Sequence, residues 1–139
     1  RRSQWGDTGP DAGGAAQQKV IWLGDTLGEM PLYYGLAHAA LLGGSFGPWG
    51  GQNLIEAAAC GCPVVAGPHT FNITQATDSA LAYGAAVRVP EINEAVEVAT
   101  AIAGDAALRA EMSAAGETLV ADNRGAAART VAAIAAALA

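Results

Sequence analysis

The residues best suited to chemistry gather in one stretch of the chain, between Gly43 and Asn72. Asn53 and Glu56 stand three residues apart, which places them on one face of a helix if this segment is helical. An amide can donate to a phosphate oxygen, and a carboxylate can accept hydrogen bonds from sugar hydroxyls. The pair therefore predicts a site for a phosphorylated, hydroxyl-rich ligand of the nucleotide kind.

Two glycine-rich turns flank this helix. Gly50-Gly51 come directly before it, and Gly67-Pro68 follow the next apolar segment. Glycine lets a backbone approach a ligand where a Cβ would clash. A helix that begins at such a turn points free N–H groups and the positive end of its dipole toward an anion. The turn at Gly51 therefore predicts a phosphate near the N–H groups of residues 51–53.

Each of these side chains also has a purely structural interpretation. Asn53 can serve only as a helix cap, and His69 can satisfy a tight turn. Glu56 can be a solvent-facing helix position, although a carboxylate among apolar neighbours is seldom buried without a partner. Trp49 either stacks on a base or anchors its own loop. We interpret His38 as a residue placed at a helix end for local reasons.

Two acids upstream, Asp25 and Glu29, are open to the same two interpretations. They are an acid/base pair, or Asp25 caps a helix whose first turn carries Glu29. The later acids predict only a solvated helix face, at Glu91, Glu94 and Glu97. No group of residues has the spacing of a metal site, so no metal is expected.

The elements that must position these residues alternate between short apolar strands and helices. Strands are predicted at residues 20–23, 39–42, 63–66 and 85–89. Helices are predicted at about residues 31–37, 51–59, 73–82, 92–103, 106–121 and 125–138. This order predicts an α/β fold, a Rossmann-like parallel sheet with helices on both faces. In such a sheet, polar ligand-binding residues gather at the carboxyl ends of the strands.

Length and composition narrow the class of protein. The 139 residues predict one domain, with residues 1–18 as a polar, flexible lead-in loop and residues 19–139 as the folded lobe. A net charge of −6 argues against a nucleic-acid partner, which would require a basic face. No apolar run approaches the roughly 20 residues that span a bilayer. The 18 glycines predict a core of small, closely packed side chains.

The two cysteines, Cys60 and Cys62, are separated by one residue. This is neither the spacing of a redox pair nor half of a zinc site with a second pair elsewhere. Positions this close also make a poor structural disulfide. We therefore expect two small apolar fillers with free thiols in a reducing compartment.

Five motifs together resemble those of the 3-deoxy-D-manno-octulosonic acid (Kdo) transferases. In chain order they are Asp25-Thr26-x-Gly28-Glu29, Tyr34-Gly35 with Ala37, Gly43-Gly44-Ser45, Gly50-Gly51-x-Asn53-x-x-Glu56 and Gly67-Pro68-His69-Thr70-Phe71-Asn72. The resemblance runs from about residue 20 to the end of the chain. A lone glycine-rich turn would be weak evidence, whereas five motifs in register form a specific combination.

The resemblance implies the C-terminal, donor-binding lobe of a GT-B glycosyltransferase that transfers Kdo from CMP-Kdo to a lipid A precursor in lipopolysaccharide synthesis. It implies that the acceptor-binding lobe, with the catalytic base and a membrane anchor, is absent from this sequence. This fragment would then hold no catalytic residue and would be inactive and soluble by itself. The full-length enzyme would use no metal or cofactor and would act at the cytoplasmic face of the bacterial inner membrane.

The same resemblance implies a donor site of ten residues, with three possible residues of the cleft between the lobes. The ten are Gly44, Ser45, Gly51, Gln52, Asn53, Glu56, Gly67, Pro68, His69 and Asn72, and the three are Asp25, Glu29 and Trp49. Gly44 and Ser45 would approach the cytidine phosphate or ribose. Asn53 would hold the phosphate, and Glu56 would accept hydrogen bonds from the ribose hydroxyls.

Two other functions stay open at the level of sequence. One is a GT-B-like nucleotide-sugar epimerase, which would prefer UDP to CMP. The other is a non-catalytic interaction module, in which the nucleotide site is vestigial and the exposed face docks a partner. A fold by itself does not separate these functions.

Overall fold

The computed structural model describes residues 1–4 and 21–138. By its internal contacts the chain divides into two compact units, Arg1–Met30 and Pro31–Ala139, which we describe separately. The predicted division after residue 18, and most of the predicted lead-in loop, lie outside the described residues.

The N-terminal unit contains little regular structure where it is described. Residues Arg2–Gln4 form a single 3-10 turn, η1, and the N–H of Arg2 donates to the carbonyl of Leu23 at 2.7 Å. Residues 21–23, which the apolar pattern predicts to be part of a strand, have no strand structure, and Ile21 is 96% exposed. That part of the prediction is wrong for this structure, because a strand needs a neighbour to pair with as well as an apolar pattern.

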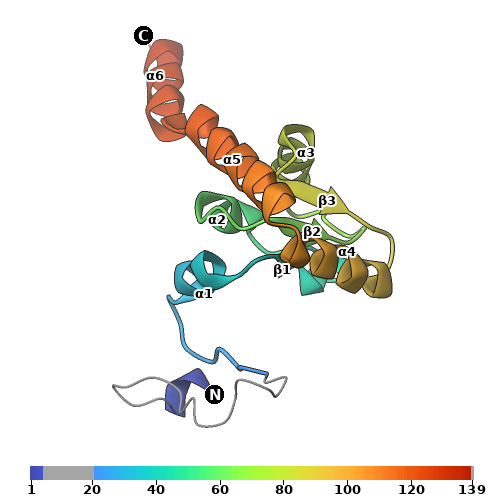
Figure 1. Cartoon of the computed structure of the whole chain (residues 1–139). Helices are drawn as coiled ribbons and strands as arrows, with labels where there is room; N and C mark the ends of the chain where they lie inside the picture. The colour runs from blue at the N-terminus through green and yellow to red at the C-terminus, as the bar shows by residue number, and fades with distance from the viewer. Residues whose placement is uncertain (5–20, 139) are drawn as a thin grey trace. The chain divides into compact units, whose positions relative to one another are not determined.

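The remaining elements follow the predicted alternation, and Figure 1 shows them along the chain. In order they are α1 (Met30–Leu36), β1 (Ala40–Leu41), the 3-10 turn η3 (Gly43–Phe46), α2 (Leu54–Ala59), β2 (Val64–Ala66), α3 (Thr74–Tyr83), β3 (Ala86–Arg88), α4 (Ile92–Gly104), α5 (Ala106–Asn123) and α6 (Ala126–Leu138). The three strands form a parallel sheet in the order β1-β2-β3. The pairing of Val64 with both Ala40 and Ala86 fixes the register of the sheet.

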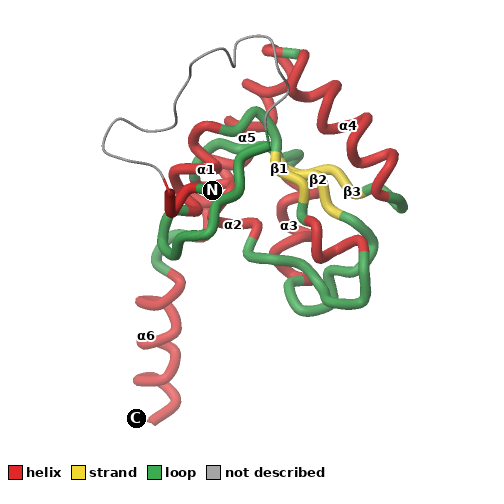
Figure 2. The backbone as a smooth tube through the Cα atoms, turned by 90° about the horizontal axis from the view of Figure 1, so that it is seen from below, coloured by secondary structure: helices red, strands yellow, loops and turns green. Residues whose placement is uncertain are grey.

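Helices cover both faces of this sheet, as predicted. Adjacent side chains of a strand point to opposite faces, and the neighbours Val64 and Val65 of β2 belong to two separate apolar clusters. The cluster of Val64 is completed from α2, α3 and α5 by Leu54, Ala80 and Leu119. The cluster of Val65 is completed from α4 and α5 by Ile102 and Met112. Figure 2 shows the strands between α4 on one side and α2 with α3 on the other.

The predicted helix ends are confirmed where the signal is local. Gly61 and Gly84 follow α2 and α3 with φ of +66° and +84°, the left-handed conformation that glycine adopts at little cost. The carboxylate of Asp105 accepts hydrogen bonds from the N–H groups of Ala107 and Leu108 at 2.9 and 3.0 Å and so caps α5. Glycine and aspartate therefore end and begin these helices for the reasons that the sequence predicts.

Helix α5 approaches α2 closely at Gly116. A Cβ at this position would lie 3.1 Å from the carbonyl oxygen and 3.3 Å from the Cα of Ala58. We expect Gly116→Val to lower the free energy of unfolding by about 1–3 kcal/mol, because the larger side chain must push the two helices apart. Urea unfolding followed by circular dichroism measures this change.

Gly104→Ala is the matched control, because a Cβ at Gly104 meets no atom within 4 Å and the residue closes α4. It is expected to raise the free energy of unfolding by up to about 1 kcal/mol through helix propensity. A Gly116→Val protein as stable as the wild type would contradict the close contact of α2 with α5.

Candidate functional site

Two loops meet at the carboxyl ends of β1 and β2, where the sequence predicts the site. We call residues 43–53 the glycine loop and residues 67–72 the histidine loop. Ser45 joins them: its Oγ accepts the N–H of Gly67 at 2.6 Å and donates to the carbonyl of Leu42 at 2.5 Å. Its carbonyl accepts the N–H of His69 at 2.9 Å. Because Ser45 is fully buried, its side chain shapes the site and has no surface to offer a ligand.

Asn72 forms a second joint between the loops. Its Oδ1 accepts the N–H of Gly51 at 2.8 Å, and its Nδ2 donates to the carbonyl of Gly51 at 2.8 Å. The predicted contact between the Gly51 N–H and a phosphate is therefore not available in this structure, since that group already has a partner. The amide of Asn72 is engaged in the same way, and the joint holds the glycine loop directly before α2.

The glycines of these loops allow the loops to approach each other. Gly50 has a φ of +81°, and a Cβ there would overlap the side-chain amide of Asn72. A Cβ on Gly44 would lie 2.6 Å from the carbonyl oxygen of Gly50, and one on Gly67 would overlap the carbonyl of Ser45. The sequence predicts close approach to a ligand here, and the structure shows in addition close approach of backbone to backbone.

Helix α2 begins at Leu54, three residues later than predicted, because Asn53 is its N-cap. The Asn53 Oδ1 accepts the N–H of Ile55 at 3.1 Å, and its Nδ2 donates to Glu56 Oε1 at 3.2 Å. The capping interpretation of Asn53 is confirmed. Both side chains are exposed, so the Asn53–Glu56 pair presents an amide and a carboxylate together at the start of the helix.

Tyr34 of α1 lies near this pair, although the sequence did not place it among the predicted site residues. Burial raises the pKa of the Tyr34 phenol, and the negative charge of Glu56 raises this pKa further. The phenol therefore stays protonated beside the carboxylate. The Tyr34-Gly35 motif contained the signal, but nothing in the sequence spacing relates residue 34 to residue 56.

The other predicted site residues of the two loops divide by exposure. Gln52, Pro68 and His69 are exposed, whereas Gly51 and Gly67 are buried in the backbone joints. Trp49 is 77% exposed, and its ring covers Gly47, where a Cβ would overlap it. The loop-anchor interpretation of Trp49 therefore has a structural basis, and the exposed ring keeps a face for stacking.

Asp25 and Glu29 belong to the N-terminal unit and already have partners there. The Asp25 carboxylate accepts the hydroxyl and the N–H of Ser3 at 2.6 and 2.8 Å, and these bonds lower the pKa of Asp25. Glu29 lies 2.8 Å from the guanidinium of Arg2 and accepts the hydroxyl of Thr26. The predicted role of Asp25 as a helix cap is wrong, since α1 begins only at Met30.

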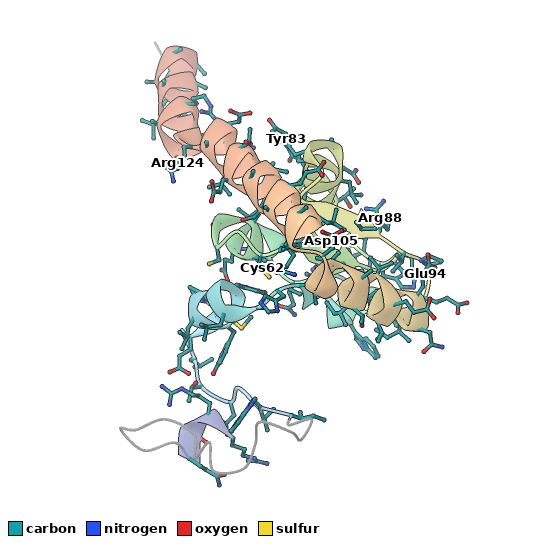
Figure 3. The ribbon with its side chains drawn as sticks, in the orientation of Figure 1. Cys62, Tyr83, Arg88, Glu94, Asp105 and Arg124 are labelled. Carbon is teal, nitrogen blue, oxygen red and sulfur yellow. The ribbon has the colours of Figure 1, made fainter. Side chains whose placement is uncertain are left out.

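A cavity of about 350 Å³ opens beside the histidine loop. Its lining combines residues of that loop with residues of α3 and β3, namely Pro68, His69, Thr70, Phe71, Thr74, Asp78 and Arg88. Figure 3 labels Arg88, which ends β3 and so lies at the carboxyl edge of the sheet. The sequence analysis missed Thr74, Asp78 and Arg88, although a charged residue at the end of a predicted strand was the available signal.

Within residues 1–4 and 21–138, no three or more His, Cys, Asp and Glu side chains gather in a way that would hold a metal ion. In the same described part of the chain, no helix has the length and apolar character needed to cross a membrane.

The sheet, its two layers of helices and the joined loops at its carboxyl edge form a Rossmann-like lobe, the kind of fold that GT-B glycosyltransferases contain. The chain is 50% identical over 111 residues to the 3-deoxy-D-manno-octulosonic acid transferase of Bordetella pertussis, which is 80% of this chain and 26% of that relative. It is 34% identical over 107 residues to the Haemophilus influenzae enzyme of the same name, covering 76% of this chain and 25% of the relative. These Kdo transferases are homologues of the chain, which spans about a quarter of their length.

A solved structure agrees with this assignment. The chain superimposes on the C-terminal CMP-Kdo binding domain of WaaA from Acinetobacter baumannii with a TM-score of 0.67 and 26% sequence identity. The match covers 72% of this chain and 52% of that domain. No protein-family model matches the chain.

We expect Ser45→Ala to lower the free energy of unfolding by about 1–3 kcal/mol, because it leaves the buried N–H of Gly67 without an acceptor. Ser79→Ala, on α3, is the matched control and should change stability by less than about 0.5 kcal/mol. Chemical denaturation of the two variants compares them directly. Equal effects would show that Ser45 does not join the two loops.

Both thiols are free, as predicted, and burial raises the pKa of Cys62 to about 11. Iodoacetamide at pH 8 should therefore label the partly exposed Cys60 in the folded protein and leave Cys62 largely unlabelled, because the reactive thiolate of Cys62 is disfavoured. The same shift should lower stability as the pH rises from about 9 to about 11, since the unfolded chain ionises first.

Mass spectrometry of Cys60→Ser and Cys62→Ser proteins separates the two labelling rates. In denaturant the two rates should become similar. Labelling of Cys62 in the folded Cys60→Ser protein at the denatured rate would contradict its burial.

Proposed function

We propose that this chain is the donor-binding lobe of a Kdo transferase and that it binds CMP-Kdo at the joined glycine and histidine loops. The observation that carries the proposal is the likeness to a CMP-Kdo binding domain over 72% of the chain. The 50% identity to a Kdo transferase over 80% of the chain supports it. The predicted residues at the carboxyl edge of the sheet supply the chemistry that such a donor requires.

The exposed Asn53–Glu56 pair is the centre of the proposed site. Only Oε1 of Glu56 bonds to Asn53, which leaves Oε2 to accept hydrogen bonds from ribose hydroxyls. The Nδ2 of Asn53 uses one of its two hydrogens for Glu56 and keeps the other for a phosphate oxygen. Capping and ligand binding are therefore compatible at Asn53, and the cap holds its amide in place.

The remaining exposed groups complete the proposed contact with the donor. Gln52 and His69 add donors from the two loops, and Pro68 lies exposed next to His69. The buried Ser45 contributes by holding the loops together and not by touching the nucleotide, and the exposed Asn72 holds them through its two bonds to Gly51.

Transfer breaks the bond between the anomeric carbon of Kdo and the phosphate oxygen of CMP, so negative charge grows on the departing phosphate. Donors at Gln52, Asn53 and His69 would stabilise this charge. In this proposal the whole enzyme activates a hydroxyl of its lipid A precursor with a base outside these 139 residues. It works without a metal at the cytoplasmic face of the inner membrane, and this chain alone turns nothing over.

We expect CMP to shift the backbone amide NMR signals of residues 43–56 and 67–72, and UDP to bind more weakly. Glu56→Ala should weaken CMP binding about tenfold, because it removes a charged acceptor of hydrogen bonds. Glu94→Ala is the matched control, since it removes an exposed acid from α4. Titration of the labelled wild-type chain with both nucleotides, and of the two variants with CMP, measures these affinities.

Each other outcome has a defined meaning. Tighter binding of UDP than of CMP would favour the epimerase-like function. If neither nucleotide shifts any signal of the folded chain, these loops do not form a nucleotide site by themselves. If neither nucleotide binds and the Glu56→Ala protein still binds a protein partner, the interaction module is favoured.

A further inference from the structure

We propose that Arg88 is a positioning residue, which fixes the histidine loop in the conformation that binds the donor by holding Thr70. The inference rests on the proposed function, because it concerns the same site. Arg88, Thr70 and Asp78 come from β3, the histidine loop and α3, and they meet in the wall of the 350 Å³ cavity.

One nitrogen of Arg88 makes both contacts. Its Nη2 donates to Oγ1 of Thr70 at 3.2 Å and to Oδ1 of Asp78 at 3.2 Å. Thr70 is only 4% exposed, whereas the side chains of Arg88 and Asp78 are 38% and 58% exposed. The exposed ion pair therefore orients a guanidinium whose second bond goes to a buried hydroxyl.

The contact at Thr70 joins the histidine loop to a different element from the one that the other joints reach. Ser45 and Asn72 tie this loop to the glycine loop. Arg88 instead ties it to β3, and the Thr70 carbonyl accepts the N–H of Ile73 at 3.0 Å and the hydroxyl of Thr74 at 3.2 Å. Thr70 is thus where the loop is fixed both to the sheet and to the start of α3.

Both sequence neighbours of the buried Thr70 face solvent. His69 precedes it and is exposed, and Phe71 follows it and is 65% exposed. A shift of the Thr70 backbone must move both neighbours. Because exposed ion pairs contribute little to global stability, loss of Arg88 should act on the conformation of the loop more than on unfolding.

The two hydrogens of the planar Nη2 point in fixed directions, one for each acceptor, whereas the N–H groups of a lysine ammonium rotate freely about its single bond. Within the described residues of the cavity wall, Arg88 is the one permanently charged cation. Arg88→Lys therefore keeps the charge and should lose most of the positioning.

The test compares CMP affinity and unfolding in the 139-residue chain. We expect Arg88→Ala and Thr70→Val each to weaken CMP binding about five- to tenfold, with the urea midpoint close to that of the wild type. The double variant should bind no more weakly than either single variant, because both remove the same contact. Thr70→Ser, which keeps the hydroxyl, should retain wild-type affinity, and Arg129→Ala on α6 is the charge-matched control.

A second measurement does not depend on a ligand. Hydrogen exchange at the amides of His69 and Ile73 should become faster in Arg88→Ala and stay unchanged in Arg129→Ala. A wild-type chain that does not bind CMP would count against the proposed function, and the exchange rates would still decide the role of Arg88. Wild-type exchange rates in Arg88→Ala, or full CMP affinity in that variant, would overturn the positioning role.

Discussion

The buried hydroxyl of Ser45 is the interaction on which the site depends. It bonds at once to the end of β1, through the carbonyl of Leu42, and to the residue that follows β2, through the N–H of Gly67. Parallel strands place their carboxyl ends side by side but do not dictate how the following loops run. The hydroxyl restrains both loops, because moving either one away would leave a buried polar group without its partner.

The residues of the candidate site consequently perform two distinct tasks. Ser45, Asn72 and the glycines at 44, 50 and 67 hold loop against loop. Asn53, Glu56 and His69 face outward and keep unused hydrogen-bonding capacity. The motifs of this site therefore contain residues that hold the loops together as well as residues that can contact a ligand. Preorganisation of this kind reduces the ordering that a ligand must impose when it binds.

The sequence predicted well the features that depend on near neighbours. The left-handed glycines 61 and 84, the cap at Asp105 and the cap at Asn53 each follow from residues within one helical turn. The joints of the site escaped prediction because their partners lie far away in sequence: 22 residues separate Ser45 from Gly67, 21 separate Gly51 from Asn72, and 18 separate Thr70 from Arg88. The strand prediction at residues 21–23 failed because an apolar pattern does not show whether a neighbouring strand is available for pairing.

Helix α5 belongs to the apolar clusters on both faces of the sheet. Its Met112 packs in the cluster on one face of the sheet, and its Leu119 packs in the cluster on the other. A short sheet of three strands would otherwise let the two small cores loosen separately. Because one continuous helix of 18 residues belongs to both, disorder in either core must fray α5 and expose part of the other. We therefore expect the two cores to unfold together.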